Sequence, residues 1–404
     1  MRLLMEAHPQ PAPVVVIGQE ELGVLSRLRE AFARMPDTRQ PGKVLHRLDE
    51  VLVCAFCSIL CDGDSFTDME DFAQTQLPWL RGFMALEHGA PSHDVFRNVF
   101  MMLRPEAMLE LFGRWCGPLE GRHVAIDGKT LRGTHDAESG RHLVHLLRAW
   151  VDERSLSAGQ VLCAEKSNEI EAIPRLLTAL ELQGCTVTID AIGTQGAIAE
   201  QIHEAGADYV LSLKANQKGA LAAVQAAFGD STPEEVPPGR PPQPPSPVPG
   251  APFIESLELS HGHCERREYQ LLGNLESFAK SWKWAGLQAV GKVRREVQRG
   301  RDGPPLREEH YFLCSFQGDI QRFATLVRGH WSVENRCHWV LDVTFGEDHC
   351  QVRDLRAAHN FSLLRELAIK VLREHPSKLS LRRKRRRAAL DPAFRLQLLA
   401  SLHA

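Results

Sequence analysis

Residues 122–131 read RHVAIDGKTL, and residues 185–193 read CTVTIDAIG. Each stretch is a short apolar run, rich in β-branched residues, that leads to an aspartate followed by a small residue; this is typical of a buried strand that ends in a turn. A strand end is a rigid position for a side chain, and a small neighbour lets a ligand come close. Asp127 and Asp190 are therefore the first candidates for a functional site.

The segments around these two stretches alternate between strand-like and helix-like patterns. They are β-rich runs at 142–152 and 157–166, an amphipathic helix at 169–184, a helix at 197–206 and a strand at 208–215. Three strands followed by helix, strand, helix and strand is the order of an RNase H-like core. The predicted fold class is therefore α/β.

The rest of the chain divides by composition. Residues 1–20 are predicted to be a disordered lead, and residues 21–116 repeat apolar residues at helical spacing, which predicts a small all-α N-terminal domain. Residues 229–252 contain ten prolines, which indicates a loop or linker. More β-rich runs extend to residue 316, and helical periodicity returns over 319–374.

Composition excludes several classes of protein. No apolar run approaches the roughly 20 residues that span a bilayer, and the first residues lack the pattern of a signal peptide, so we expect a cytoplasmic protein without a membrane partner. No G-x-x-x-x-G-K-[ST] loop is present, so no nucleotide cofactor is expected. The net charge is −3, yet from Gln351 onward 13 Lys and Arg face four Asp and Glu. A basic end suits contact with a polyanion, and it equally suits a solvated tail.

Ten cysteines do not change this interpretation. Cys54, Cys57 and Cys61 look at first like a metal cluster, but their spacing puts them on the inward face of a buried helix. No second Cys/His pair at zinc-finger spacing accompanies them. Reduced core thiols are the expected state of such residues.

Two aspartates on adjacent strands can share one hard divalent ion, because the cation removes the repulsion between them. For either aspartate alone, a strand that ends in a turn is the simpler explanation. A third ligand is expected in RGHWSVENRCHWVLDVTFGED, residues 328–348, where Glu334 falls mid-helix with His330 and His338 one turn away on either side. The alternatives are that Glu334 is a solvated helix residue, or that the ligand is Asp342, Glu347 or Asp348.

Several of these segments, in this order, carry a resemblance to a known family. The sequence resembles the H-repeat-associated group of DDE insertion-sequence transposases. The matching core segments are VAIDGKTLRG, KSNEIEAIP, VTIDAIGTQGAIAEQI, GADYVLSLKANQ and the Glu334 segment quoted above. DTRQPGKVLHRLDEVLVCAFCSILCDGDSFTDMEDF and PSHDVFRNVF resemble the group's associated N-terminal domain, and SLRRKRRRAAL resembles its ending. Together they cover nearly the whole chain.

The resemblance implies which residues do the chemistry and how the chain divides. Asp127, Asp190 and Glu334 would be the three metal-binding catalytic acids. Residues 117–217 and 321–375 would be two parts of the RNase H-like catalytic core, and the β-rich insertion 218–320 would lie between them. Residues 376–404 would form a basic C-terminal tail.

The resulting hypothesis is a Mg²⁺-dependent DNA transposase that nicks DNA at the ends of an insertion sequence and joins them to target DNA. Two Mg²⁺ ions fit oxygen ligands and in-line phosphoryl displacement, and Mn²⁺ can replace them. The expected partners are the terminal inverted repeats and target DNA, bound by a homodimer in a bacterial nucleoid. The alternatives are an inactive or domesticated copy that only binds DNA, and an RNase H-like nuclease without strand transfer.

Basic side chains near the predicted strand ends and at the C-terminus are candidates for contact with DNA. A solvated surface role is the alternative for the lysines and arginines. The candidates are Lys129, Lys214, His330, His338, Arg382 and Arg383.

Overall fold

The computed structural model of the protein describes residues 18–134, 144–163, 169–230, 251–260, 263–273, 275, 284–299 and 304–402. Most of the predicted lead 1–20 and of the proline-rich segment 229–252 lies outside the described residues. The chain divides into two compact units. One unit comprises Met1–Leu103 with Ala368–Ala404, and the other comprises Arg104–Leu367.

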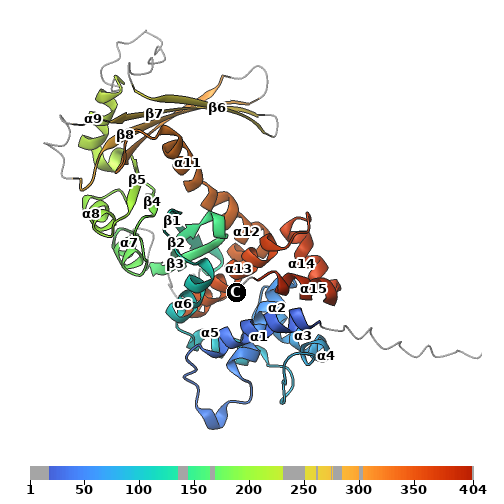
Figure 1. The fold of residues 1–404 in the computed structure, drawn as a ribbon. Helices are drawn as coiled ribbons and strands as arrows, with labels where there is room; N and C mark the ends of the chain where they lie inside the picture. Colours follow the sequence, from blue (N-terminus) through green and yellow to red (C-terminus); the bar gives the residue numbers. More distant parts are fainter. Residues whose placement is uncertain are drawn as a thin grey trace, which may run out of the picture. The chain divides into compact units, whose positions relative to one another are not determined.

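The larger unit is built on one nine-stranded sheet with the order β3-β2-β1-β4-β5-β9-β8-β7-β6 (Figure 1). In its first half, β1, β2 and β3 are antiparallel, and β4 and β5 continue the sheet parallel to β1. This order agrees with the predicted RNase H-like core. The strands of this half are β1 (His123–Leu131), β2 (Val144–Val151), β3 (Leu156–Cys163), β4 (Thr186–Ile189) and β5 (Asp208–Leu213).

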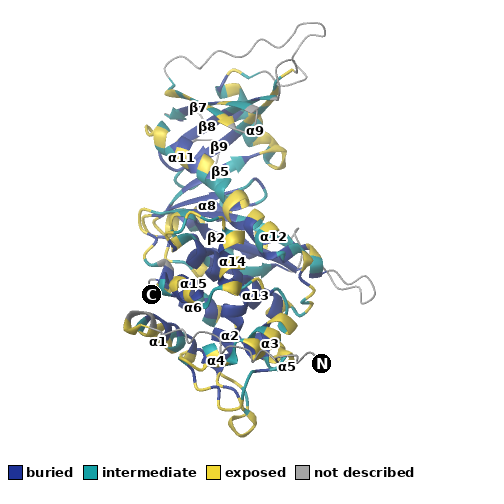
Figure 2. Cartoon of the chain, turned by 90° about the vertical axis from the view of Figure 1, so that its right-hand side faces the viewer, coloured by how far each residue is buried: buried dark blue, intermediate teal, exposed yellow. Residues whose placement is uncertain are grey.

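Helices cover this half of the sheet and bury its central strands. All eight residues of β2 are buried, as are all four of β4 (Figure 2). Strands buried on both faces read as continuous apolar runs, which is why VTI and HLLRAWV lack strict alternation. The helices in contact with these strands are α6 (Pro105–Cys116), α7 (Glu169–Thr178), α8 (Gly196–Glu204) and α11 (Ile320–His330).

The β-rich insertion extends the same sheet instead of forming a separate one. Its last strand, β9, pairs antiparallel with β5, from Val210↔Cys314 to Leu213↔Tyr311. Phe323 of α11 packs with Phe312 and Tyr269 in the apolar core beneath this extension. The elements of the insertion are α9 (Lys218–Ala227), β6 (Phe253–Ser260), β7 (His263–Gly273), β8 (Ala289–Arg299) and β9 (Leu306–Cys314).

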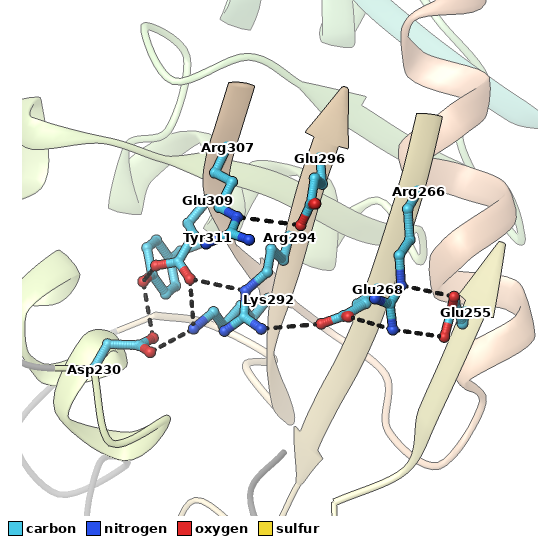
Figure 3. A network of polar contacts seen from close by, with 10 residues as sticks. All are labelled: Asp230, Glu255, Arg266, Glu268, Lys292, Arg294, Glu296, Arg307, Glu309 and Tyr311. Atoms are coloured by element: carbon cyan, nitrogen blue, oxygen red, sulfur yellow. Dashed lines mark hydrogen bonds and ion pairs between the residues drawn. The ribbon is translucent and has the colours of Figure 1, made fainter. Parts of the chain in front are cut away.

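A ladder of alternating charges crosses these four strands (Figure 3). Arg294 lies between Glu268, at 3.1 Å, and Glu309, at 3.2 Å. Lys292 contacts the same Glu309 at 3.2 Å and Asp230 at 2.5 Å. Opposite charges on neighbouring strands favour this register. These cations are held in intramolecular ion pairs, so they do not form a free basic surface.

The smaller unit is helical, and the basic C-terminal residues are part of it. Residues 376–404 were expected as a tail, but they include α14 and α15, which pack with α1 and α2. The reason is that part of the basic run faces inward: Arg385 is fully buried and donates to the Ile59 carbonyl at 3.0 Å. The helices of this unit are α1 (Gln19–Ala33), α2 (Leu48–Leu60), α3 (Phe66–Thr75), α4 (Leu77–Leu80), α5 (His93–Met102), α14 (Leu381–Leu390) and α15 (Pro392–Ala400).

Two helices lie at the boundary of the units in sequence. The last helix of the predicted N-terminal domain 21–116, α6, is part of the larger unit. The helix α13 (Leu355–Glu374) contributes residues to both units. No helix in the described part of the chain is long and apolar enough to cross a membrane.

The buried arginine of α14 provides a test of this packing. Arg385 also pairs with Asp62 at 3.0 Å and Asp64 at 3.2 Å. Arg385→Ala should lower the free energy of unfolding by about 3 kcal/mol, because it removes a fully buried side chain and leaves the buried Ile59 carbonyl without its donor. The exposed neighbour substitution Arg386→Ala should change it by less than about 0.5 kcal/mol. Urea unfolding of the two variants measures the difference, and equal stabilities would contradict the buried placement.

Candidate functional site

Asp127 and Asp190 are brought together by the parallel pairing of β1 with β4. The last paired residues are Ile126 and Ile189, so the two aspartates occupy the next position on neighbouring strands. Neighbouring strands lie about 5 Å apart. Asp190 follows the end of β4 as predicted, whereas Asp127 lies inside β1, which continues to Leu131. The end of β4 therefore defines the edge of the sheet at which the two aspartates lie side by side.

Burial and like charges raise the pKa of both aspartates. The pKa of Asp127 rises to about 7, through burial first and then through the charges of Asp190, Glu334 and Glu169. The pKa of Asp190 is also raised, by burial and by Glu169, against the opposing effects of backbone N–H groups and of Lys214. Several carboxylates therefore share one partly buried region, and a cation there would relieve their repulsion.

Glu334 is the third predicted acid, and it lies on an irregular helical turn. A π-helix, η6 (Val333–His338), separates α11 from α12 (Trp339–Phe345), where one regular helix was predicted. Glu334 is exposed, and its carboxylate makes no hydrogen bond or ion pair with any residue that the structure describes. Its charge reaches Asp127, because it contributes to the raised pKa of that carboxyl. Single π-turns of this kind are frequent at functional sites.

The acidic alternatives to Glu334 are engaged elsewhere. Asp342 accepts from Lys129 Nζ at 2.5 Å, and Asp348 lies 3.5 Å from the same nitrogen. Glu347 is completely buried and accepts from Ser362 Oγ at 2.6 Å. Glu334 is therefore the acid of this segment that is best placed to accept an external ligand.

The three carboxylates do not form a preformed metal shell. Within the described ranges, no three His, Cys, Asp or Glu side chains are already gathered around one position that could hold a metal ion. Their chemistry nevertheless fits a divalent cation, because all three offer the oxygen ligands that Mg²⁺ prefers. Burial and the neighbouring carboxylates raise the pKa of Asp127, and a cation bound at this point would lower it.

The structure separates the predicted DNA-contacting residues into two groups. Lys129 is buried and ion-paired, and His330 is half-buried with its Nδ1 2.8 Å from Thr188 Oγ1. Burial lowers the pKa of His330 to about 4, so it is neutral. Both side chains make internal contacts in this structure, and their contact with DNA stays a prediction. Lys214, Arg382 and Arg383 are exposed, the two arginines on α14.

His338 lies at the carboxylates instead of on an outer surface. Its Nδ1 is 3.4 Å from Asp127 Oδ2, and its side chain is only 12% exposed. Burial holds the pKa of His338 well below its usual value, so the ring is neutral. A neutral imidazole can orient a carboxylate without competing for its charge.

Glu169 and His145 were not singled out from the sequence. Glu169 is buried at the start of α7, and its Oε1 is 2.7 Å from His145 Nε2. A Cβ atom on Gly128 would come within 2.4 Å of that oxygen, so a larger residue next to Asp127 would displace the Glu169 carboxylate. No spacing in the sequence sets Glu169 apart from other acids in a first helical turn.

A buried ion pair supports β1 from the neighbouring strand. Arg148 of β2 is paired in register with Asp127, and its Nε donates to Glu366 Oε1 of α13 at 2.7 Å. Both side chains are completely buried. Removing one partner of such a pair costs several kcal/mol, so this contact fixes α13 against the sheet that carries the aspartates.

Comparisons with known proteins agree with this arrangement. Residues 118–369 match the family described as "Transposase DDE domain", and residues 29–116 match "DDE_Tnp_1-associated". The chain is 35% identical over 388 residues to "H repeat-associated putative transposase YhhI" from Escherichia coli (strain K12), covering 93% of this chain and 98% of that protein.

A shorter relative and a solved structure are also similar. "Inactive transposase YbfQ" from Escherichia coli (strain K12) is 35% identical over 75 residues, which are 19% of this chain and 89% of that protein. The "Cryo-EM structure of piggyBac transposase synaptic complex with hairpin DNA (SNHP)" aligns with 93% of this chain and 80% of that chain, at 11% identity and a TM-score of 0.37. The family match over most of the sheet and over all three acids decides the assignment: the chain belongs to the transposase DDE domain family.

Proposed function

We propose that this protein is an active DDE-type DNA transposase, which nicks DNA at the ends of its insertion sequence and transfers the ends into target DNA. The observation that carries the proposal is the position of Asp127 and Asp190 on paired strands, with Glu334 close enough to raise the pKa of Asp127. Family membership supports the same activity. Phosphodiester chemistry by two-metal sites needs such a set of carboxylates.

Asp127, Asp190 and Glu334 are the proposed ligands of two Mg²⁺ ions, which Mn²⁺ can replace. Bound at these oxygens, the ions would supply an activated hydroxyl nucleophile and stabilise the leaving oxygen of an in-line displacement. The chain's own contribution is to hold the carboxylates in place. His338 contacts Asp127 at 3.4 Å, and backbone N–H of Ile192 donates to Asp190 at 3.1 Å.

The proposed partners are the terminal inverted repeats of the element and target DNA. Lys214 is exposed and its charge reaches Asp190, so it can meet a phosphate near the acids. Arg382 and Arg383 offer a second, separate basic surface on α14. We further propose a homodimer on DNA, since two ends must be joined, and a location in the nucleoid, where the DNA is.

Two other functions use the same features. One is a copy that binds DNA without cutting it, and the relative YbfQ is named an inactive transposase. A nuclease without strand transfer is the other. Two observations favour an active enzyme. Asp127, Asp190 and Glu334 are all present, and the Glu334 carboxylate has no hydrogen-bond or ion-pair partner among the described residues.

The first prediction from this proposed function concerns the acids. Asp190→Asn keeps the shape of the side chain but removes a charge that metal binding needs. Nicking of a supercoiled plasmid that carries the gene with its native flanking DNA should fall to background in Mg²⁺, and Asp127→Asn and Glu334→Gln should do the same. The losses should not add, because the three act as one unit.

Glu200→Gln is the matched control, because Glu200 is an exposed acid on α8. It should cut at the parent rate. A plasmid nicked by the parent without any joined product would favour the nuclease, and a parent that binds but does not nick would favour the inactive copy. Near-parental cutting by Asp190→Asn would falsify the three-acid site.

The second prediction concerns pH. Because the pKa of Asp127 is raised to about 7, protonation of this carboxyl favours the folded state. That contribution is complete below about pH 4 and is lost as the pH rises through about 7. Without metal, Asp127→Asn should therefore unfold roughly 2–6 °C above the parent at about pH 8, and at the same temperature near pH 4.

Mg²⁺ provides the complementary measurement. It should raise the unfolding temperature of the parent more at about pH 8 than at about pH 6, because its ligand must be ionised. Asp127→Asn should lose this pH-dependent gain. A gain that does not change with pH would show that Asp127 is not a metal ligand.

A further inference from the structure

An exposed apolar strip follows the helical turn that carries Glu334. Trp339 is 57% exposed, and Val343, one turn further along α12, is 51% exposed. The intervening Val340 and Leu341 are buried in the core. The helix therefore turns a tryptophan and a valine outward on one side, and an exposed large aromatic next to a functional site is a candidate binding surface.

The π-helix decides which side of the helix Trp339 occupies. The backbone N–H of Trp339 donates to the carbonyl of Glu334, five residues earlier. This bond places Trp339 one turn after Glu334, on the same side of the helix. In a regular α-helix, residues five apart point roughly 140° away from each other. The irregular turn thus presents an exposed tryptophan on the side that carries the third acid.

The chemistry of this strip fits a base better than a phosphate or a protein. A phosphate would meet the negative charge of Glu334, whereas a base is neutral and has a π-face that stacks on indole. The one arginine nearby on the same segment, Arg336, is engaged with Asp152 at 2.5 Å. A protein partner would need about 20 residues on this side, and the strip offers two.

We propose that Trp339, flanked by Val343, stacks on a nucleic-acid base beside the phosphate on which the three acids act. This inference rests on the proposed DNA-cutting function and adds to it a binding site for one nucleotide. Stacking of this kind tolerates any base. Trp339 would therefore fix the position of a nucleotide relative to Glu334, and would not read its sequence.

The test uses the full chain and a short nicked DNA duplex with fluorescent 2-aminopurine at the nick. Ca²⁺ replaces Mg²⁺, so that the duplex is bound without being cut. Binding to the parent should quench 2-aminopurine, as stacking does. Trp339→Leu should weaken binding about tenfold and abolish the quench, and Trp339→Phe should retain most of both. Leu259→Ala, which removes an 80% exposed side chain from β6, is the control and should match the parent.

The outcomes separate this inference from the proposed function. If Trp339→Leu binds within about twofold of the parent with an unchanged quench, the stacking site is wrong while the acid site stands. If the parent fails to bind the duplex, both are wrong. If Trp339→Leu instead changes the oligomeric mass in light scattering, the strip is a contact between copies and the proposal is overturned.

Discussion

The parallel pairing of β1 with β4 is the constraint on which the site depends. It ends at Ile126 and Ile189 and so puts two aspartates side by side at one edge of the sheet. Burial raises the pKa of both aspartates, and neighbouring carboxylates add to the shift: Asp190 acts on Asp127, and Glu169 acts on both. A cation bound between these carboxylates would reduce the repulsion, so this arrangement favours cation binding.

The surrounding ion pairs determine which acids take part. Lys129 forms an ion pair with Asp342. Glu347 pairs with Arg148 and accepts a hydrogen bond from Ser362, which also accepts one from Arg148. These partners neutralise charges that would otherwise be costly to bury. Among the described residues, no lysine or arginine contacts the carboxylates of Asp127, Asp190 or Glu334. The structure thus separates acids that are paired within the fold from acids that are not, although Glu334 lies in the same segment as Asp342 and Glu347.

The basic residues also divide into side chains that are buried or ion-paired and side chains that are exposed. Arg385 and Arg395 are fully buried in the helical unit, and the cations of β7 and β8 are paired along the charge ladder. A local excess of Lys and Arg therefore overstated the surface available to DNA. The exposed charges that fit DNA contact are fewer: Lys214 near the acids, and Arg382 and Arg383 on α14.

The sequence by itself determined the order of strands along the chain, because apolar periodicity and strand-to-turn signals are local. It also indicated Asp127, Asp190 and the segment of Glu334 as the candidate site. It could not show that β1 runs past Asp127, that a π-turn interrupts the helix at Glu334, or that Glu169 reaches the aspartates from α7. These features depend on residues far apart in the chain. Only the tertiary structure decided which charges are buried in pairs and which are left for a ligand, because ion pairing depends on proximity in space.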